Sequence, residues 1–347
     1  MRVTGIHLPI APSAPTEARK AEASEASPID QFRPTFLSTM EDVDPGPISR
    51  PDDPPPRLPR PVLMVHGYNG SAERWEHLVG WLTSGDAPVN RDGGTLVAGQ
   101  NTPIDPQANL FSLRFSRPFN SVDSNARELR EAVERVCAAT GAREVDLVTH
   151  SMGGLDARLY LDSADERVGK VVMLAPPDHG SQLANLELVF REKFGYPIQP
   201  PVDDPEVRRA LHQLSVDKTK GGVPQNPFLH ELNQHWDQQR GRADILIMTA
   251  NGIPTLTSKP GVTIYGDGVV TRASAVMPDV PAKHVWFRTH GGIQNTAKVM
   301  EETARFLAGV PLSPETELYE RPEDAQRVAE LIRQEKEKLA AEYYIAS

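Results

Sequence analysis

The stretch Val145-Asp-Leu-Val-Thr-His-Ser-Met-Gly-Gly-Leu-Asp-Ala-Arg-Leu-Tyr160 decides the fold of this chain. Its first residues are apolar and mostly β-branched, which predicts a buried strand, and its last residues place apolar side chains at helical spacing. Ser151 lies between the two. A serine at so tight a strand-to-helix turn has a strained backbone, and only small neighbours let the strand and the helix close around it. Gly153 and Gly154 meet that requirement, so we expect the Ser151 hydroxyl to be presented as a nucleophile.

The six residues from Thr149 to Gly154 read Thr-His-Ser-Met-Gly-Gly and carry a family resemblance. They resemble the Gly-x-Ser-x-Gly nucleophile elbow of α/β-hydrolases, especially that of bacterial lipases and esterases. The chain departs from the pattern at its first position, where Thr149 replaces glycine. A chance Ser-x-Gly turn is the alternative. The resemblance implies an α/β fold, with a mostly parallel sheet, helices on both faces and an inserted cap or lid.

Composition narrows the classes of partner. A net charge of −10 argues against nucleic acid, because phosphate backbones require basic patches. No apolar run approaches the ~18–20 residues that a transmembrane helix needs, and the N-terminus lacks the basic-then-apolar pattern of a secretory signal. The expected location is cytoplasmic. Secretion by a route that needs no signal peptide stays open as an alternative. The single cysteine, Cys137, excludes an intrachain disulfide and a zinc site built from cysteines.

Three regions are expected along the chain. Residues 1–59 are rich in Pro, Ala, Ser and Glu, without an apolar period, which predicts a disordered leader. Residues 60–309 alternate apolar strands with helices, and this alternation predicts a parallel sheet covered on both faces. Within them, residues 182–240 break the rhythm and are interpreted as the cap. Residues 310–347 are predicted to form a charged helical extension, either a solvated surface helix or a docking element for a partner.

A second motif precedes the elbow at His66-Gly-Tyr68. It follows an apolar strand that begins near Arg60. In the lipase-like enzymes that the chain resembles, such a strand ends in His-Gly, and the N–H of the next residue helps to form the oxyanion hole. Tyr68 would supply that N–H here, and Met152, at the start of the helix after Ser151, would supply the second.

The acid is predicted at Asp267, within Ile264-Tyr-Gly-Asp-Gly-Val-Val270. A carboxylate at a strand end has to turn back towards an imidazole, and flanking glycines permit that turn. The Gly-Asp-Gly-Val-Val pattern also resembles the acid loop of lipases. Asp279 is the second candidate, and an ordinary Asp-Gly turn is the alternative without function.

The base should follow the acid, because the chain order in α/β-hydrolases is Ser, Asp, His. His284 precedes Val-Trp-Phe and would be carried into the sheet by that strand. His290 comes after the strand, in front of Gly-Gly and a helix, where the family keeps its catalytic histidine. The interpretation therefore favours His290. His179, in a loop that resembles a structural loop of lipases, is expected to have a structural role.

No cofactor and no metal are expected. Three acidic residues of the loop before residue 107 could ligate a hard cation, but they lack a compact Asp-x-Asp pattern and are interpreted as turn formers: Asp86, Asp92 and Asp105.

The resemblance implies a serine hydrolase of carboxylic esters, most directly a lipase, that acts through Ser151, Asp267 and His290. A carboxylesterase for small esters is the first alternative, and phospholipase, thioesterase or acyltransferase activity could use the same triad. A catalytically silent fold that serves as a binding module would lack a triad member. The expected partners are an ester substrate and, transiently, a lipid interface, because the predicted cap combines apolar side chains with flexible joints.

Overall fold

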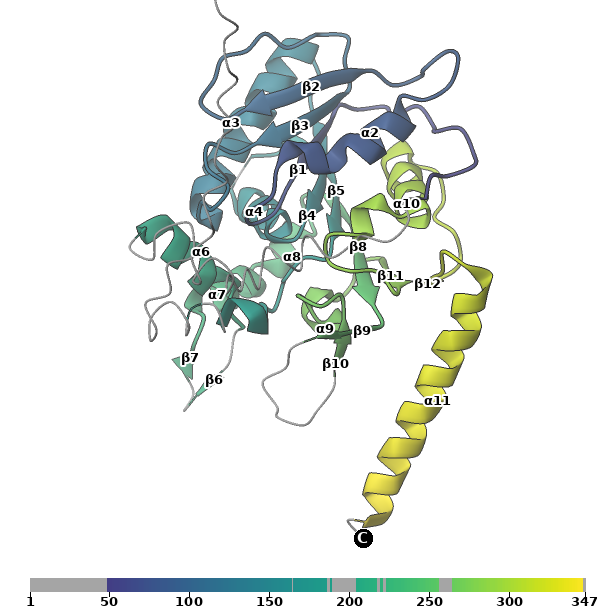
Figure 1. Ribbon diagram of the computed structural model, residues 1–347. Helices are drawn as coiled ribbons and strands as arrows, with labels where there is room; N and C mark the ends of the chain where they lie inside the picture. The colour runs from purple at the N-terminus through teal and green to yellow at the C-terminus, as the bar shows by residue number, and fades with distance from the viewer. Residues whose placement is uncertain are drawn as a thin grey trace, which may run out of the picture. The chain divides into compact units, whose positions relative to one another are not determined.

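The computed structural model describes residues 49–163, 165–185, 188, 204–216, 219–220, 223–255 and 264–345. Eight strands form one sheet in the order β12-β11-β8-β5-β4-β1-β3-β2 (Figure 1). Every neighbouring pair in this sheet is parallel. The strands are β1 (Val62–Val65), β2 (Asp92–Val97), β3 (Leu110–Arg114), β4 (Val145–His150), β5 (Val168–Leu174), β8 (Asp244–Asn251), β11 (Ala282–Trp286) and β12 (Glu317–Leu318).

Helices cover both faces of the sheet, and β1 shows how. Leu63 and Val65 pack in one apolar cluster with α3 (Val122–Thr140) and α4 (Met152–Asp162). Val62 and Met64 point the other way, into a cluster with α2 (Glu76–Leu82) and α10 (Ala297–Ala308). Successive side chains of a strand alternate between faces, so a strand that is apolar throughout needs cover on both. The predicted α/β fold is confirmed.

The predicted helices and strands of the body are found with small shifts. The helix that ends at Thr140 begins after Ser121, whose hydroxyl accepts a hydrogen bond from the N–H of Ser124, and it terminates at Gly141 with φ 72°. The helical segment that follows the His66-Gly-Tyr68 motif starts as a 3₁₀ turn, η2 (Ala72–Trp75), before α2. A second 3₁₀ turn, η3 (Ile293–Asn295), precedes α10.

Several elements lie between β5 and β8, in the region predicted as the cap. They are α6 (Pro205–Leu214), β6 (Thr219–Lys220), β7 (Val223–Pro224), α7 (Pro227–Gln234) and α8 (Trp236–Gln239). Buried side chains of α6 and α7 share an apolar cluster with Met152 and Leu155 of the elbow helix. The described part of this region therefore packs directly over α4, the helix that follows Ser151. Whether any part of it moves as a lid stays a prediction.

The boundary predicted at residue 59 is too late. Leu58 is 3% exposed, and its N–H donates to Asn90 Oδ1 at 2.9 Å. The carbonyl oxygens of Asp53 and Pro56 accept hydrogen bonds from Trp81 and Asn90. These prolines and their neighbours have no helical or strand periodicity, but they satisfy polar groups of the domain, so residues 49–59 belong to it. Residues 1–48 lie outside the described residues.

The C-terminal extension contains the predicted charged helix as α11 (Pro322–Ile345). It also contains β12, which was not predicted from the sequence and which pairs with β11 at the edge of the sheet. A strand of two residues has too few side chains to show a period. Among the described residues, no helix combines the length and the apolar character that a membrane span requires.

Candidate active site

Ser151 stands at the turn between β4 and α4 with φ 54° and ψ −128°. Residues other than glycine rarely occupy this region of backbone conformation. The N–H of Ser151 donates to the carbonyl of Leu174 at 2.9 Å, and its carbonyl accepts from the N–H of Gly154 at 2.9 Å. The strand before it and the helix after it are both buried, so the surrounding structure holds the strain. The predicted elbow geometry is present.

The glycines after Ser151 are required by close packing. A Cβ atom at Gly153 would lie 2.9 Å from the carbonyl oxygens of both Val65 and His66, and one at Gly154 would lie 2.8 Å from Cβ of Pro176. Thr149, the departure from the family pattern, is fully buried, and its hydroxyl donates to the carbonyl of Val172 at 3.2 Å. The strand accepts the larger residue because that hydroxyl has a partner.

Gly67 brings the second motif against the elbow. A Cβ atom there would lie 2.7 Å from Cβ of Ser151 and 3.2 Å from the nitrogen of Met152. The peptide that leads to Tyr68 therefore passes beside the N-terminus of α4, where the first N–H groups of a helix have no partner within it. His66 braces this turn through Nδ1 and the Gly67 carbonyl at 2.9 Å, and burial lowers the pKa of His66 to about 4, so the ring is neutral and Nδ1–H donates.

Asp267 and His290 meet directly. His290 Nδ1 lies 2.7 Å from Asp267 Oδ2, and the N–H of His290 donates to the carbonyl of Asp267 at 2.9 Å. Asp267 is 3% exposed and His290 is 2% exposed, so water screens their interaction little. Two bonds, one from a side chain and one from the backbone, fix the ring against the carboxylate.

The other carboxylate oxygen of Asp267 is held by its own loop. Oδ1 accepts from the N–H groups of Val269 at 2.9 Å and Val270 at 2.6 Å. A Cβ atom at Gly266 would lie 2.2 Å from the carbonyl of Val270, which explains the first glycine of Gly-Asp-Gly. The strand before Asp267 is not in the main sheet: β10 (Ile264–Gly266) pairs with β9 (Ile253–Thr255) in a separate hairpin.

His150, next to Ser151, packs against His290. Its Nε2 lies 2.8 Å from the carbonyl oxygen of His290, and the two ring centroids are 4.7 Å apart. Burial lowers the pKa of His150 well below its usual value, and the positive form of His290 lowers it further. His150 is therefore neutral and donates from Nε2–H. No role was predicted for His150 from the sequence, although its place in Thr-His-Ser was the available signal.

Ser151 and His290 line one narrow pocket with room for about 30 Å³. The rest of its wall is mostly apolar. The lining residues are Tyr68, Asn69, Ser151, Pro177, Ser181, Ala184, Leu214, Val269, Val270 and His290. The arrangement can present a serine hydroxyl and an imidazole to a small group that enters this pocket.

The competing candidates lie elsewhere. His284 is within β11, where Nδ1 is 2.8 Å from the hydroxyl of Thr249, and burial lowers its pKa to about 4. Asp279 has 69% of its side chain exposed and lies 3.6 Å from Arg240. His179 contacts the carbonyl of Ser274 through Nδ1 at 3.0 Å. His284 thus belongs to the sheet, and Asp279 belongs to a surface turn.

The acidic loop residues behave as turn formers. Asp92 Oδ1 accepts from the N–H of Gly94 at 2.7 Å, and Asp105 Oδ1 accepts from the N–H of Gln107 at 2.9 Å. Among the described residues, no group of three or more His, Cys, Asp or Glu side chains could hold a metal ion.

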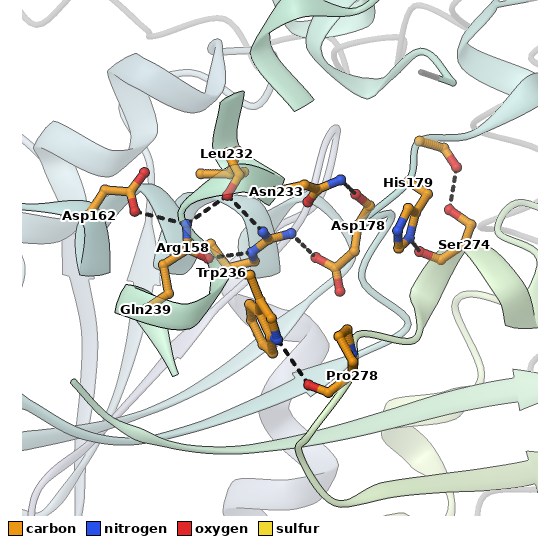
Figure 2. Close-up of polar contacts among 11 residues, drawn as sticks. Arg158, Asp162, Asp178, His179, Leu232, Asn233, Trp236, Gln239, Ser274 and Pro278 are labelled. Carbon is orange, nitrogen blue, oxygen red and sulfur yellow. Dashed lines mark hydrogen bonds and ion pairs between the residues drawn. The ribbon is translucent and has the colours of Figure 1, made fainter. Parts of the chain in front are cut away.

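A buried ion pair that was not predicted from the sequence joins α4 to the loop after β5 (Figure 2). Arg158 of α4 lies 2.9 Å from Asp178, and both side chains are fully buried. Arg158 also donates to Gln239 at 2.8 Å and to the carbonyl of Leu232 at 3.1 Å, and its guanidinium lies 5.1 Å from the centre of the Trp236 ring. One arginine therefore ties α4 to the loop after β5 and to α7 and α8, in the region predicted as the cap.

Comparisons with known proteins agree with this architecture. A family model for the alpha/beta hydrolase fold matches residues 99–243. A triacylglycerol lipase of Pseudarthrobacter phenanthrenivorans is 27% identical over 125 residues, which are 36% of this chain and 35% of that protein. The chain thus aligns with about a third of the length of this curated relative.

Two solved structures are similar at lower identity. The Bacillus licheniformis lipase BlEst2 in its propeptide form has a TM-score of 0.51 and 19% identity over 78% of this chain and 55% of that one. Phospholipase PlaB from Legionella pneumophila has a TM-score of 0.50 and 19% identity over 72% and 59%. Together with the family match and the parallel sheet, these similarities show the fold.

Proposed function

We propose that this chain, an α/β-hydrolase-fold protein, is a serine hydrolase that cleaves carboxylic esters, most directly a lipase. One observation carries the proposal: Asp267 fixes His290 at 2.7 Å, while His290 and the strained Ser151 line one pocket. Nucleophile, base and orienting acid are the three parts of an acyl-transfer triad. The similarity of part of the chain to triacylglycerol lipases supports an ester as the substrate.

In the proposed reaction, Ser151 Oγ attacks the ester carbonyl while His290 Nε2 takes its proton. Asp267 holds the tautomer that leaves Nε2 available and stabilises the imidazolium that forms. The N–H groups of Tyr68 and Met152 hold the negative oxygen, each contributing about 3 kcal/mol to the transition state. His290 then gives the proton to the departing alcohol, and a water repeats the sequence to release the acid from Ser151.

A carboxylesterase acting on small esters is the second candidate, and the small size of the pocket that Ser151 and His290 line favours it. The apolar lining supports a lipase whose cap opens to admit longer chains. The two differ in chain-length preference and in their response to aggregated substrate.

The proposal is tested by an active-site label and a substrate series. A fluorophosphonate should add once to the wild type and not to Ser151→Ala, as seen by intact-mass spectrometry. A labelled alanine variant, or an active wild type that takes no label, would contradict the assignment of Ser151.

p-Nitrophenyl esters of increasing acyl length, with a phospholipid and a triacylglycerol emulsion beside them, then define the substrate. A jump in rate as tributyrin passes its solubility limit supports the lipase. A smooth hyperbola with best activity on acetate makes the protein a carboxylesterase.

A further inference from the structure

Glu320, in the C-terminal extension between β12 and α11, connects the two ends of the segment that carries His290. Its Oε2 lies 3.2 Å from the guanidinium of Arg288, two residues before His290. Its Oε1 accepts from the N–H of Lys298, in the first turn of α10, at 3.3 Å. The side chains of Arg288 and Glu320 are 11% and 8% exposed, so the pair is little screened by water.

Ser49, from the other end of the domain, joins the same carboxylate. Its hydroxyl donates to Glu320 Oε2 and accepts from the N–H of Ala297, the first residue of α10, at 3.0 Å. A negative charge near the N-terminus of a helix is favourable, because the first N–H groups point towards it. Glu320 therefore fixes the start of α10 as well as the loop in front of it.

The loop needs such support because it leaves β11 through a strained residue. Phe287 has φ 57°, a left-handed conformation that costs a residue with a side chain about 1–2 kcal/mol. Arg327 of α11 covers the Phe287 ring, with its guanidinium carbon 4.2 Å from the ring centre. The N–H of Phe287 donates to the carbonyl of Asn251 at 2.7 Å. Strained residues persist only where the surrounding structure holds them.

The same extension holds the strand before the loop. Trp286 Nε1 donates to Glu317 of β12 at 2.5 Å. Lys283 Nζ donates to the carbonyls of Ser313 and Glu315, both at 2.6 Å. Residues 313–327 of the extension thus contact the chain from β11 to Arg288, the residue before Thr289.

We propose that the C-terminal extension is a clamp on residues 287–290, the base loop. In this proposal Glu320 is a positioning residue that acts through Arg288 and Lys298 on His290. This inference rests on the proposed function, in which His290 is the base. Without the carboxylate, the loop is free to relax at Phe287, and His290 moves relative to Ser151 and Asp267. Displacements of about 1 Å at a reacting group can reduce the rate about 100-fold.

The test compares Glu320→Gln with Glu323→Gln. The second is a matched control, since Glu323 lies in the same extension with 66% of its side chain exposed and only a 3.8 Å approach to Arg321. Glu320→Gln should reduce kcat about 10-fold with KM changed less than about two-fold, because positioning acts on the chemical step. Glu323→Gln should match the wild type.

A proton NMR readout separates this inference from the proposed function. The His290 Nδ1–H bound to Asp267 should give a far-downfield signal that is absent from His290→Ala, and Glu320→Gln should broaden or shift it. If the wild type hydrolyses no ester, the function fails and the signal alone decides the clamp. An unchanged signal and kcat in Glu320→Gln, with only a lower Tm, would reduce Glu320 to a structural residue and overturn the clamp.

Discussion

The two halves of the candidate site are built in different ways. Ser151, the proposed nucleophile, stands on one continuous stretch from β4 to α4, whose close contacts come from Gly153, Gly154 and neighbouring strands. The base loop is assembled from segments far apart in the sequence: Asp267, His150, Glu320 and Arg327 all contact residues 287–290. A short motif can encode the first half, whereas the second depends on the whole domain. Substitutions should therefore act locally on the elbow and over long distances on the base.

The largest effect is expected where the assembled half meets the chemistry. Asp267→Asn should reduce kcat about 10⁴-fold, because an amide favours the wrong imidazole tautomer. Asp279→Asn is the control, since its carboxylate is exposed and contacts only Arg240 among the described residues. Steady-state rates on one ester measure both. Equal losses in the two variants would remove Asp267 from the triad.

The next effect concerns stability behind the elbow helix. Arg158→Met should cost about 3–5 kcal/mol of unfolding free energy, because it leaves Asp178 buried without its partner. Burial raises the pKa of Asp178 and Arg158 opposes that shift, so removing Arg158 should raise the pKa of Asp178 further. Urea unfolding measures the loss.

A double variant, Arg158→Met with Asp178→Leu, serves as the control for that loss. It should recover most of the stability, since apolar groups of similar volume can replace a buried pair. A single variant as stable as the wild type would show that the pair does not hold α4 to the cap.

Gly67→Ala tests the half of the site that is built around the elbow. Its Cβ atom would lie 2.7 Å from Cβ of Ser151, so the peptide before Tyr68 must move away from Met152. A misplaced oxyanion donor should reduce kcat about 10²–10³-fold. Gly80→Ala, where the nearest atom is Arg50 Nη2 at 3.7 Å, should leave kcat unchanged. A fully active Gly67→Ala would argue against this oxyanion hole.

The smallest effect on catalysis is expected at His284, six residues before the base. Its pKa is about 4 in the folded protein and 6.5 as the reference value. Because the folded pKa is the lower one, its contribution to stability is complete above pH 6.5 and is lost as pH falls towards 4. Between pH 6.5 and pH 4, the free energy of unfolding of the wild type should fall by up to about 3 kcal/mol relative to that of His284→Gln.

Thermal unfolding at several pH values measures that difference, with His179→Gln as the exposed control. The kcat of His284→Gln should stay within about three-fold of the wild type, because His284 has no proposed role in the chemical step. A loss as large as that of Asp267→Asn would reassign the base to His284.

The sequence alone predicted the elbow, the alternating strands and helices, and the contact of Asp267 with His290. Each of these depends on local constraints: a buried strand reads as a short apolar run, and the turns at Ser151 and Asp267 need adjacent glycines. The sequence distinguishes His284 from His290 because the strand that contains His284 carries it into the sheet, whereas His290 comes after that strand ends.

Only the tertiary structure decided what supports the site. Arg158 and Asp178 are 20 residues apart, and Glu320 and Ser49 are 271 apart. Neither pair leaves a periodic signal, since a charged residue in a helix or after a strand usually reads as solvated surface. Residues 49–59 and β12 were misassigned or missed for the same reason. Proline-rich and two-residue segments have no pattern of their own, and their place in the domain comes from the groups that they satisfy there.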